Sequence, residues 1–155
     1  MRKSILNSRE RLVVTLVKAS AVAAIFISQA FMTSGDNTLT VKITGIQIPH
    51  GTIEVGLYDT SKKFPKVGAQ IKKIRKKVTA KSMSFKFTGL ENGDYAIATY
   101  HDENSDGKCN KNLIGYPTEA YAFSNDFRPF LSSPSFKNCQ FWVTENRTLN
   151  IKMVY

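Results

Sequence analysis

Apolar and polar residues alternate along most of the chain after residue 38, whereas helical periodicity is nearly absent. The alternation is clearest in residues 39–43, 53–57, 83–87, 136–143 and 149–153. A period of two is typical of a strand with one buried face, so each range predicts a short β-strand. The first two ranges flank the turn sequence Pro49-His50-Gly51, and we expect them to form a hairpin.

A second kind of segment predicts a strand with both faces buried. Residues 95–100 form a short β-branched and aromatic run between an Asn92-Gly93 turn and a polar loop. With this run the chain has about seven strands at intervals marked by turns. The pattern predicts an all-β fold: an antiparallel β-sandwich of about seven strands with Greek-key connections, immunoglobulin-like or transthyretin-like, carrying one long polar loop.

Residues 1–30 have the pattern of an export signal rather than of a folded segment. Basic residues precede an apolar run, Ala19 to Ile27, and Ser28-Gln29-Ala30 is a small-x-small cleavage sequence. A retained signal anchor is the alternative, but Lys18 near the centre of the apolar stretch would cost about 2.5–3.5 kcal/mol on insertion. We expect cleavage, and an exported protein that is periplasmic or secreted.

The mature chain, residues 31–155, is expected to be a single domain without a transmembrane span. Its 125 residues are enough to bury a substantial core. Removal of residues 1–30 takes away five basic and one acidic residue, so the net charge of +10 falls to +6.

The long polar loop contains a spacing that suits a cation. Asp102, Asn104 and Asp106 are followed by Gly107, as in the first half of the calcium loop D-x-[DN]-x-[DN]-G. The second half is missing, since Leu113 stands where a bidentate Glu would be needed, and the nearest free carboxylate is Glu119. The candidate calcium ligands are Asp102, Asn104, Asp106, Lys108, Asn110, Asn112 and Glu119. The alternative is a polar turn in which Asp and Asn side chains bind their own backbone.

The same stretch resembles the signature of a family of small exported bacterial proteins, domain of unknown function family 2141. That signature reads roughly D-E-N-x-[DN]-G-x-x-D-x-N-x-x-G-x-P-x-E-x-[YW]-G-F-S-N. The matching residues are Asp102, Glu103, Asn104, Asp106, Gly107, Asn112, Gly115, Pro117, Glu119, Phe123, Ser124 and Asn125, whereas Cys109, Asn110 and Ala122 depart from it. The resemblance implies an exported β-sandwich of no established activity.

Two cysteines, Cys109 and Cys139, lie in the mature chain and would meet an oxidising compartment after export. A disulfide between them would close a loop of about 30 residues and stabilise the fold by about 3–4 kcal/mol. The alternative is two small buried thiols.

Residues 62–86 contain ten basic residues and no acidic one. Such a run attracts anionic partners, which after export means anionic envelope lipids or glycans, and the candidate contacts are Lys72, Lys73, Arg75, Lys76 and Lys77. Nucleic acid is not expected, because residues 65–84 lack the aromatic side chains of a single-strand binder. The alternative is an edge strand that its lysines protect from pairing with another chain.

An enzyme is not predicted. A hydrolase using His101, Asp102 and Glu119, or a relay from His101 to Ser124, is the weakest of three hypotheses because Ser124 lies in no nucleophile elbow. Zinc is not expected, since the histidines and cysteines lack ligand spacing. We therefore expect a non-catalytic binding or structural module with a calcium-ordered loop; the alternative is an anion binder through residues 62–86.

Overall fold

The structure is a computed structural model that describes residues 35–129 and 133–155 of the 155-residue chain. The predicted export signal, residues 1–30, lies outside the described residues. The elements are β1 (Asn37–Thr44), β2 (Thr52–Tyr58), β3 (Lys72–Lys77), β4 (Met83–Leu90), β5 (Gly93–Asp102), β6 (Tyr121–Phe123), the 3-10 turn η1 (Ser124–Asp126), α2 (Phe136–Cys139), β7 (Phe141–Val143) and β8 (Arg147–Lys152).

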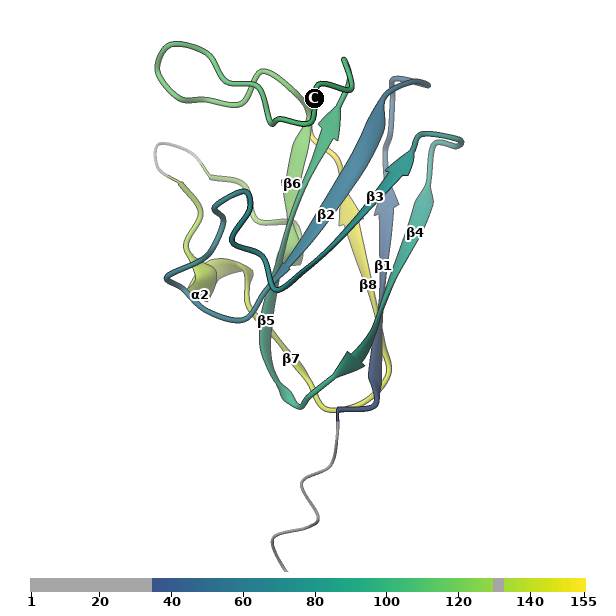
Figure 1. Ribbon diagram of the computed structural model, residues 1–155, viewed down its shortest axis with the longest axis vertical. Helices are drawn as coiled ribbons and strands as arrows, with labels where there is room; N and C mark the ends of the chain where they lie inside the picture. The colour runs from purple at the N-terminus through teal and green to yellow at the C-terminus, as the bar shows by residue number, and fades with distance from the viewer. Residues whose placement is uncertain (1–34, 130–132) are drawn as a thin grey trace, which may run out of the picture. The chain divides into compact units, whose positions relative to one another are not determined.

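The strands form two sheets that pack face to face (Figure 1). One sheet has the order β4-β1-β8; the other has the order β3-β2-β5-β6, with β7 also paired to β5. All pairs are antiparallel except β1 with β8, which are parallel. The chain passes from one sheet to the other four times.

The core lies between the two sheets and is made by alternate residues of each strand. Fully buried side chains include Val41 of β1, Val55 of β2, Phe85 of β4 and Ile97 of β5. Because the strand period is two, the residues between them point away from this core. In β2 and β5 these outward residues form a second face, which carries the candidate site.

The prediction of an antiparallel sandwich of about seven strands is confirmed, with eight strands in the described part of the chain. The predicted hairpin of residues 39–43 with 53–57 is wrong, because β1 and β2 belong to different sheets. Both strands bury one face in the same core, so their alternation cannot show which sheet each joins. The seven residues between them are enough to cross the roughly 10 Å between packed sheets.

The predicted strand 136–143 is half right. Residues 141–143 form β7, but Phe136–Cys139 form the short helix α2. The side chain of Ser135 caps this helix by accepting a hydrogen bond from the backbone N–H of Asn138 (3.3 Å). Over these four residues the helix cap favours a helical turn more strongly than the alternating pattern favours a strand. Within residues 35–129 and 133–155, no helix is long and apolar enough to cross a membrane.

The edges of the two sheets meet where β3 lies beside β4. Lys72 and Lys76 of β3 reach across this gap, and their Nζ atoms donate to the backbone carbonyls of Thr88 (2.6 Å) and Ser84 (2.8 Å) of β4. The Lys76 ammonium also lies 5.1 Å from the ring centroid of Phe85. The alternative interpretation of the basic run, an edge strand, is confirmed for Lys72–Lys77, and two lysines of this strand also cover the edge of the opposite sheet.

The two edge contacts predict a change in association. In a Lys72→Ala/Lys76→Ala variant the carbonyls of Ser84 and Thr88 are open to a strand of another molecule, so we expect concentration-dependent self-association in analytical ultracentrifugation. Lys73→Ala/Lys77→Ala removes the same charge from the other side of β3 and should stay monomeric under conditions where the wild-type chain does. Equal association of the two variants would mean that lost charge, and not the uncovered edge, is responsible.

Candidate functional site

The outer face of the five-stranded sheet has a hollow at its centre, which the strand register explains. Gly56 of β2 pairs with Ala98 of β5, and Ala98 pairs with Phe123 of β6. The row therefore has two small residues side by side. A Cβ on Gly56 would lie only 3.1 Å from the ring of Tyr58, so a larger side chain at this position would displace that ring and fill the hollow.

Large side chains surround these two small residues on the same face. The row towards the long loop is Glu54, Tyr100 and Tyr121, and the row on the other side begins with Tyr58. Tyr121 packs against Phe123, with ring centroids 5.7 Å apart. The strands thus supply a floor of glycine and alanine with aromatic side chains around it.

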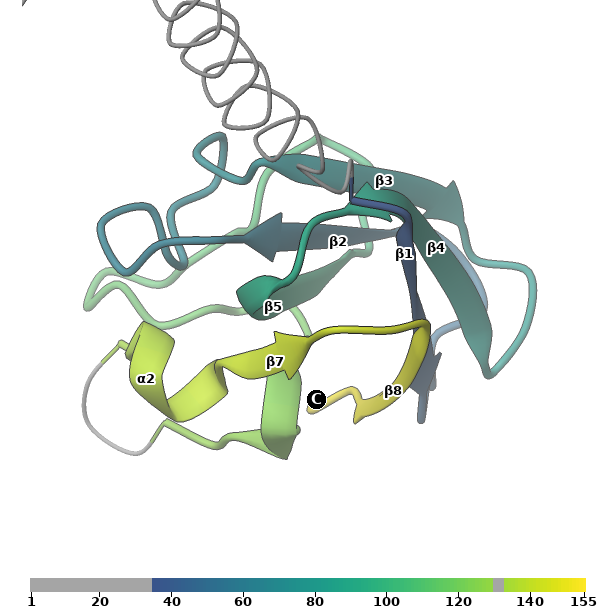
Figure 2. The same ribbon diagram turned by 90° about the horizontal axis from the view of Figure 1, so that it is seen from below.

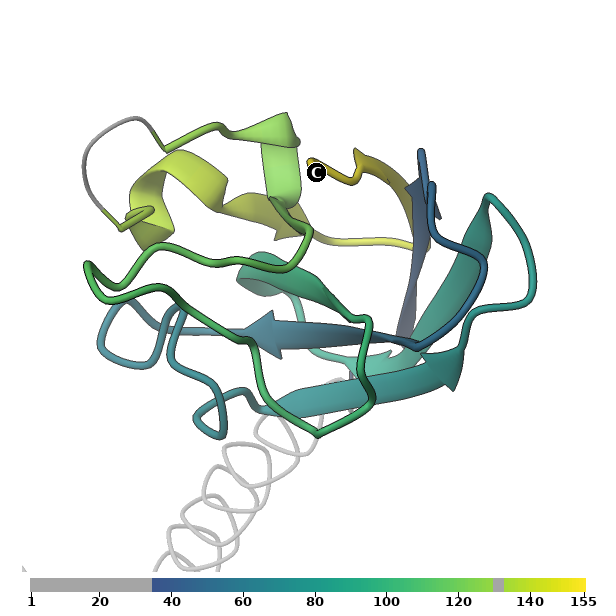
Figure 3. The same cartoon turned by 90° about the horizontal axis from the view of Figure 1, so that it is seen from above.

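Loops outside the strands turn the hollow into a pocket of about 540 Å³. Loop 59–71 adds Pro65 and Val67, and loop 103–120 adds Cys109, Lys111 and Ile114 to Pro117. Figures 2 and 3 show both loops and α2 on the side of the five-stranded sheet that faces away from β1, β4 and β8. The volume falls within the range of small-molecule sites, about 300–1,000 Å³.

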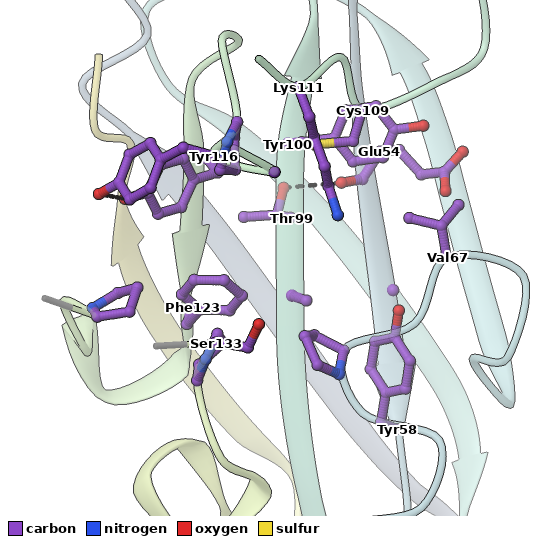
Figure 4. A pocket seen from close by; sticks show the side chains of 18 of the residues that line it. Glu54, Tyr58, Val67, Thr99, Tyr100, Cys109, Lys111, Tyr116, Phe123 and Ser133 are labelled. Carbon is purple, nitrogen blue, oxygen red and sulfur yellow. Dashed lines mark hydrogen bonds between the residues drawn. The ribbon is translucent and has the colours of Figure 1, made fainter. Parts of the chain in front are cut away.

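Glu54 gives the pocket a buried carboxylate. The residue is 4% exposed, and Figure 4 shows it at the edge of the pocket near Tyr100 and Val67. Its closest cations are Arg75 Nη1 at 3.7 Å and Lys73 Nζ at 3.8 Å, both beyond hydrogen-bond distance from Oε2. Among the described residues no side chain or backbone N–H donates to this carboxylate, so its hydrogen-bonding capacity is free for a molecule in the pocket.

Two tyrosine hydroxyls of the pocket stay neutral at physiological pH. Burial, then the nearby Glu54 carboxylate and Tyr100, raise the pKa of Tyr58 to about 12. Burial and then Glu54 also raise the pKa of Tyr100. The Tyr58 hydroxyl donates to the carbonyl of Lys66 at 3.1 Å and so ties loop 59–71 to the pocket wall.

An ion pair holds the base of loop 103–120. The Asp102 carboxylate, fully buried at the end of β5, pairs with the guanidinium of Arg75 from β3. It also accepts the backbone N–H groups of Asp106 (3.1 Å) and Gly107 (2.9 Å). The Arg75 Nε donates to Thr52 Oγ1 of β2 at 3.0 Å. One arginine therefore joins two strands to the start of the loop.

Three further polar side chains fix the rest of the loop by accepting backbone N–H groups. Glu119 accepts from Glu103 (3.2 Å) and Asn110 (3.0 Å), and so joins the two ends of the loop. Asn112 accepts from Tyr116 (2.9 Å) within the tip of the loop. Asp106 accepts from Lys108 (2.8 Å), and this bond is the main cause of its lowered pKa.

The sequence predicted several of these residues as calcium ligands. The structure brings Asp102, Asn104 and Asp106 together at the base of the loop, but their oxygens accept backbone N–H groups, and Asp102 has Arg75 as its cation. In the chain from 35 to 129 and from 133 to 155, no group of three or more His, Cys, Asp and Glu side chains could hold a metal ion. Calcium binding stays a prediction. Lys108 and Asn110, two of the predicted ligands, instead donate their backbone N–H groups to Asp106 and Glu119.

Residues 41–151 match a family of bacterial proteins described as uncharacterized proteins conserved in bacteria, DUF2141. The chain belongs to this family. No curated protein and no solved structure matches the chain. The match covers the sandwich from β1 to β8, and the expected resemblance is confirmed.

The motif that resembles the DUF2141 signature is, in this structure, a set of loop-fixing residues. Its polar members accept or donate hydrogen bonds within the loop or next to it. Asn125, with a positive φ of 62°, donates to the backbone carbonyls of Asn138 (3.3 Å) and Gln140 (3.0 Å). The motif thus specifies the shape of the loop that covers the pocket, and most of the pocket lining lies outside it.

The five candidate anion contacts of β3 are not equivalent. Lys72 and Lys76 bind β4 carbonyls, and Lys73 and Arg75 lie near Glu54. Among the described residues, Lys77 makes no such polar contact. Anion binding through this set stays a prediction, and these contacts compete with it.

Cys109 and Cys139 are free thiols in the structure, so the predicted disulfide is not formed there. Ser124 Oγ binds both the N–H of Ile97 and the carbonyl of Cys139, which places Cys139 beside Ile97. Cys109 lies at the pocket near Tyr100 (Figure 4). Ile97 and Tyr100 are three residues apart on β5, which corresponds to about 10 Å. The two cysteines beside them are therefore too far apart for a disulfide. Burial raises the pKa of Cys139 to about 12.

His101 and Ser124, the residues of the weakest hypothesis, are buried and face other groups. His101 Nε2 donates to the carbonyl of His50 (2.7 Å), and Nδ1 shares a hydrogen bond with the Tyr155 hydroxyl (2.9 Å). Ser124 Oγ accepts the N–H of Ile97. Both side chains have structural partners.

Sequence reasoning missed the pocket floor. Residues 95–100 were expected to be a strand buried on both faces, and Gly56 was interpreted only as part of an alternating strand. One feature of the sequence could have indicated the pocket. The outward positions of β2 and β5 include the small residues Gly56, Ala96 and Ala98 beside Tyr58 and Tyr100. Small outward residues on adjacent strands leave room, but their pairing could not be known.

The ion pair predicts a large loss of stability in Arg75→Met. This change leaves the Asp102 carboxylate buried without its cation, so we expect the free energy of unfolding to fall by about 3 kcal/mol, the lower end for breaking a buried pair, because Arg75 is one-third exposed. Urea denaturation measures it. Lys77→Met, on the exposed part of the same strand, should change stability by less than about 0.5 kcal/mol. Equal losses would show that the pair is not what stabilises the loop.

Calcium provides a second test of the loop. If Arg75 is the only cation of Asp102, the melting temperature of the wild-type protein should be the same in chelator and in millimolar calcium. A calcium site of extracellular strength would instead add about 2.7 kcal/mol at 100 times its dissociation constant. A rise in melting temperature that Asp106→Ala abolishes would establish the predicted calcium site and overturn our explanation of the loop.

Proposed function

We propose that this protein is a non-catalytic binding module that acts after export and holds a small, largely apolar molecule in the pocket over β2 and β5. The observation that carries the proposal is the register of small residues within a ring of aromatic ones: Gly56 and Ala98 are paired at the centre, and Tyr58, Tyr100, Tyr121 and Phe123 surround them. A pocket lined in this way excludes water from an apolar ligand.

Glu54 adds a requirement on the ligand. A carboxylate that is 4% exposed and receives no hydrogen bond from the described residues is stabilised by a ligand that carries a hydrogen-bond donor. The expected ligand is therefore an apolar body with an N–H, O–H or ammonium group at one end. Lys111, which lines the pocket (Figure 4), offers a second polar contact to the ligand.

The arrangement of the buried polar residues supports a non-catalytic role. A hydrolase needs a nucleophile within reach of a base, whereas His101 and Ser124 are occupied by backbone and tyrosine partners. Asp102 serves the ion pair with Arg75. None of these buried residues needs a catalytic role to explain its position. Export is supported by the pattern of residues 1–30.

Filling the hollow tests the proposal. N-phenyl-1-naphthylamine is a neutral apolar fluorophore with one N–H donor, and its emission rises when it leaves water. Ala98→Phe places a ring over Gly56, so we expect its affinity for this probe to fall by at least about tenfold, which corresponds to about 1.4 kcal/mol. Ala98→Leu should give a smaller loss in the same titration.

The matched control is Thr148→Phe, which adds the same ring at an exposed position of β8 on the other sheet. It should bind the probe as the wild-type protein does. Unfolding curves for all variants separate a blocked pocket from a damaged fold. If folded Ala98→Phe binds the probe as tightly as the wild-type protein, the pocket is not the binding site.

A further inference from the structure

The tip of loop 103–120 exposes two large aliphatic side chains to water. Leu113 is fully exposed, and Ile114 is 87% exposed. Burial of such side chains is favourable, so a protein surface seldom presents two of them together at the end of a loop without a partner. Figure 1 shows this loop projecting from one end of the sandwich.

The tip is a well-defined turn. Lys111 and Pro117 form a bridge, and the N–H of Gly115 donates to the carbonyl of Asn112 at 2.9 Å. The Asn112 side chain accepts the N–H groups of both Ile114 (3.2 Å) and Tyr116 (2.9 Å). Four hydrogen-bonded residues thus hold the two aliphatic side chains outwards.

The pocket does not account for these side chains. Leu113 is not among the pocket's lining residues, although its neighbour Ile114 is. A molecule inside the pocket therefore leaves Leu113 in water. A partner that covers Leu113 would therefore lie outside the pocket.

The size and charge of the surroundings favour one class of partner. Two side chains at a convex tip are far smaller than the roughly 1,200–2,000 Å² of a stable protein interface, but they suit insertion about 5–10 Å deep into a lipid interface. Exposed lysines lie on the same loop (Lys108 and Lys111) and on loop 59–71, the other loop that lines the pocket (Lys62, Lys63 and Lys66).

Acidic groups lie away from the tip. Segments 60–71 and 107–118 contain no Asp or Glu. Asp59 is paired with Lys63 at 3.5 Å, and Asp106 and Glu119 belong to the hydrogen-bonded base of loop 103–120. The lysines of these two segments therefore present a positive field to an approaching surface.

We propose that Leu113 and Ile114 insert into the interface of an anionic lipid bilayer, while lysines of loops 59–71 and 103–120 contact its headgroups. This membrane-docking tip is a different surface from strand β3. It shares Ile114 and Lys111 with the rim of the pocket, but the insertion of Leu113 does not require a ligand in the pocket.

A tryptophan placed at the tip tests this proposal locally. The chain has one tryptophan, Trp142 on β7, so Leu113→Trp in a Trp142→Phe background reports on position 113 alone. Purified protein is titrated with vesicles of equal parts phosphatidylglycerol and phosphatidylcholine. We expect a blue shift and quenching by brominated acyl chains, with a much weaker effect on pure phosphatidylcholine vesicles and at high salt.

Partition of the otherwise unchanged chain gives the second measurement. Leu113→Asn/Ile114→Asn should weaken cosedimentation with the anionic vesicles by about tenfold or more, because the inserted apolar surface is gone. Trp142→Ser removes an exposed apolar residue at another place (53% exposed) and should change nothing. All three replaced side chains are at least half exposed, and unfolding curves check that each variant keeps the wild-type fold.

Three outcomes would overturn the proposal. The first is a tip tryptophan that stays in water with every vesicle. The second is equal partition of Leu113→Asn/Ile114→Asn and the wild-type protein, which would assign binding to the lysines or another segment. The third is self-association of the wild-type protein that the double variant abolishes, which would make a second copy of the chain the partner.

Discussion

The contact between Arg75 and Asp102 joins edge strand β3 to the end of β5 and to the loop that follows it. Arg75 lies on edge strand β3, Asp102 ends the central strand β5, and the same carboxylate holds the first turn of loop 103–120. This loop then supplies one wall of the pocket. A buried carboxylate without a cation is unstable, so the shape of the pocket depends on a residue outside its lining.

The five-stranded sheet performs two tasks because strand side chains alternate. The inward residues of β2 and β5 complete the core, while the outward ones form the floor and walls of the pocket. Loops can vary around such a floor without disturbing the core, since the two sets of residues share a backbone but few contacts. The hollow follows from two small residues in register, with the aromatic side chains of Tyr58, Tyr100, Tyr121 and Phe123 around them.

Sequence patterns predicted individual strands well and their partners poorly. The period of two located β1, β2, β4 and β8, because burial of one face is a local property. It failed for the β1–β2 hairpin and could not predict the parallel pairing of β1 with β8, since pairing depends on residues far apart in the chain. The D-x-N-x-D-G spacing located the loop and predicted a calcium site there, which stays a prediction. Arg75, 27 positions earlier, could not be recognised as the partner of Asp102.

The parallel pairing of β1 with β8 also determines how the domain bears mechanical load. The two strands are neighbours over six residue pairs, from Leu39 with Arg147 to Thr44 with Lys152, and the chain enters β1 at one end of this ladder and leaves β8 at the other. A pull on the two ends of the domain therefore slides the strands along each other and strains every ladder hydrogen bond at once. Antiparallel terminal strands would be peeled apart one bond at a time, so this connectivity resists stretching.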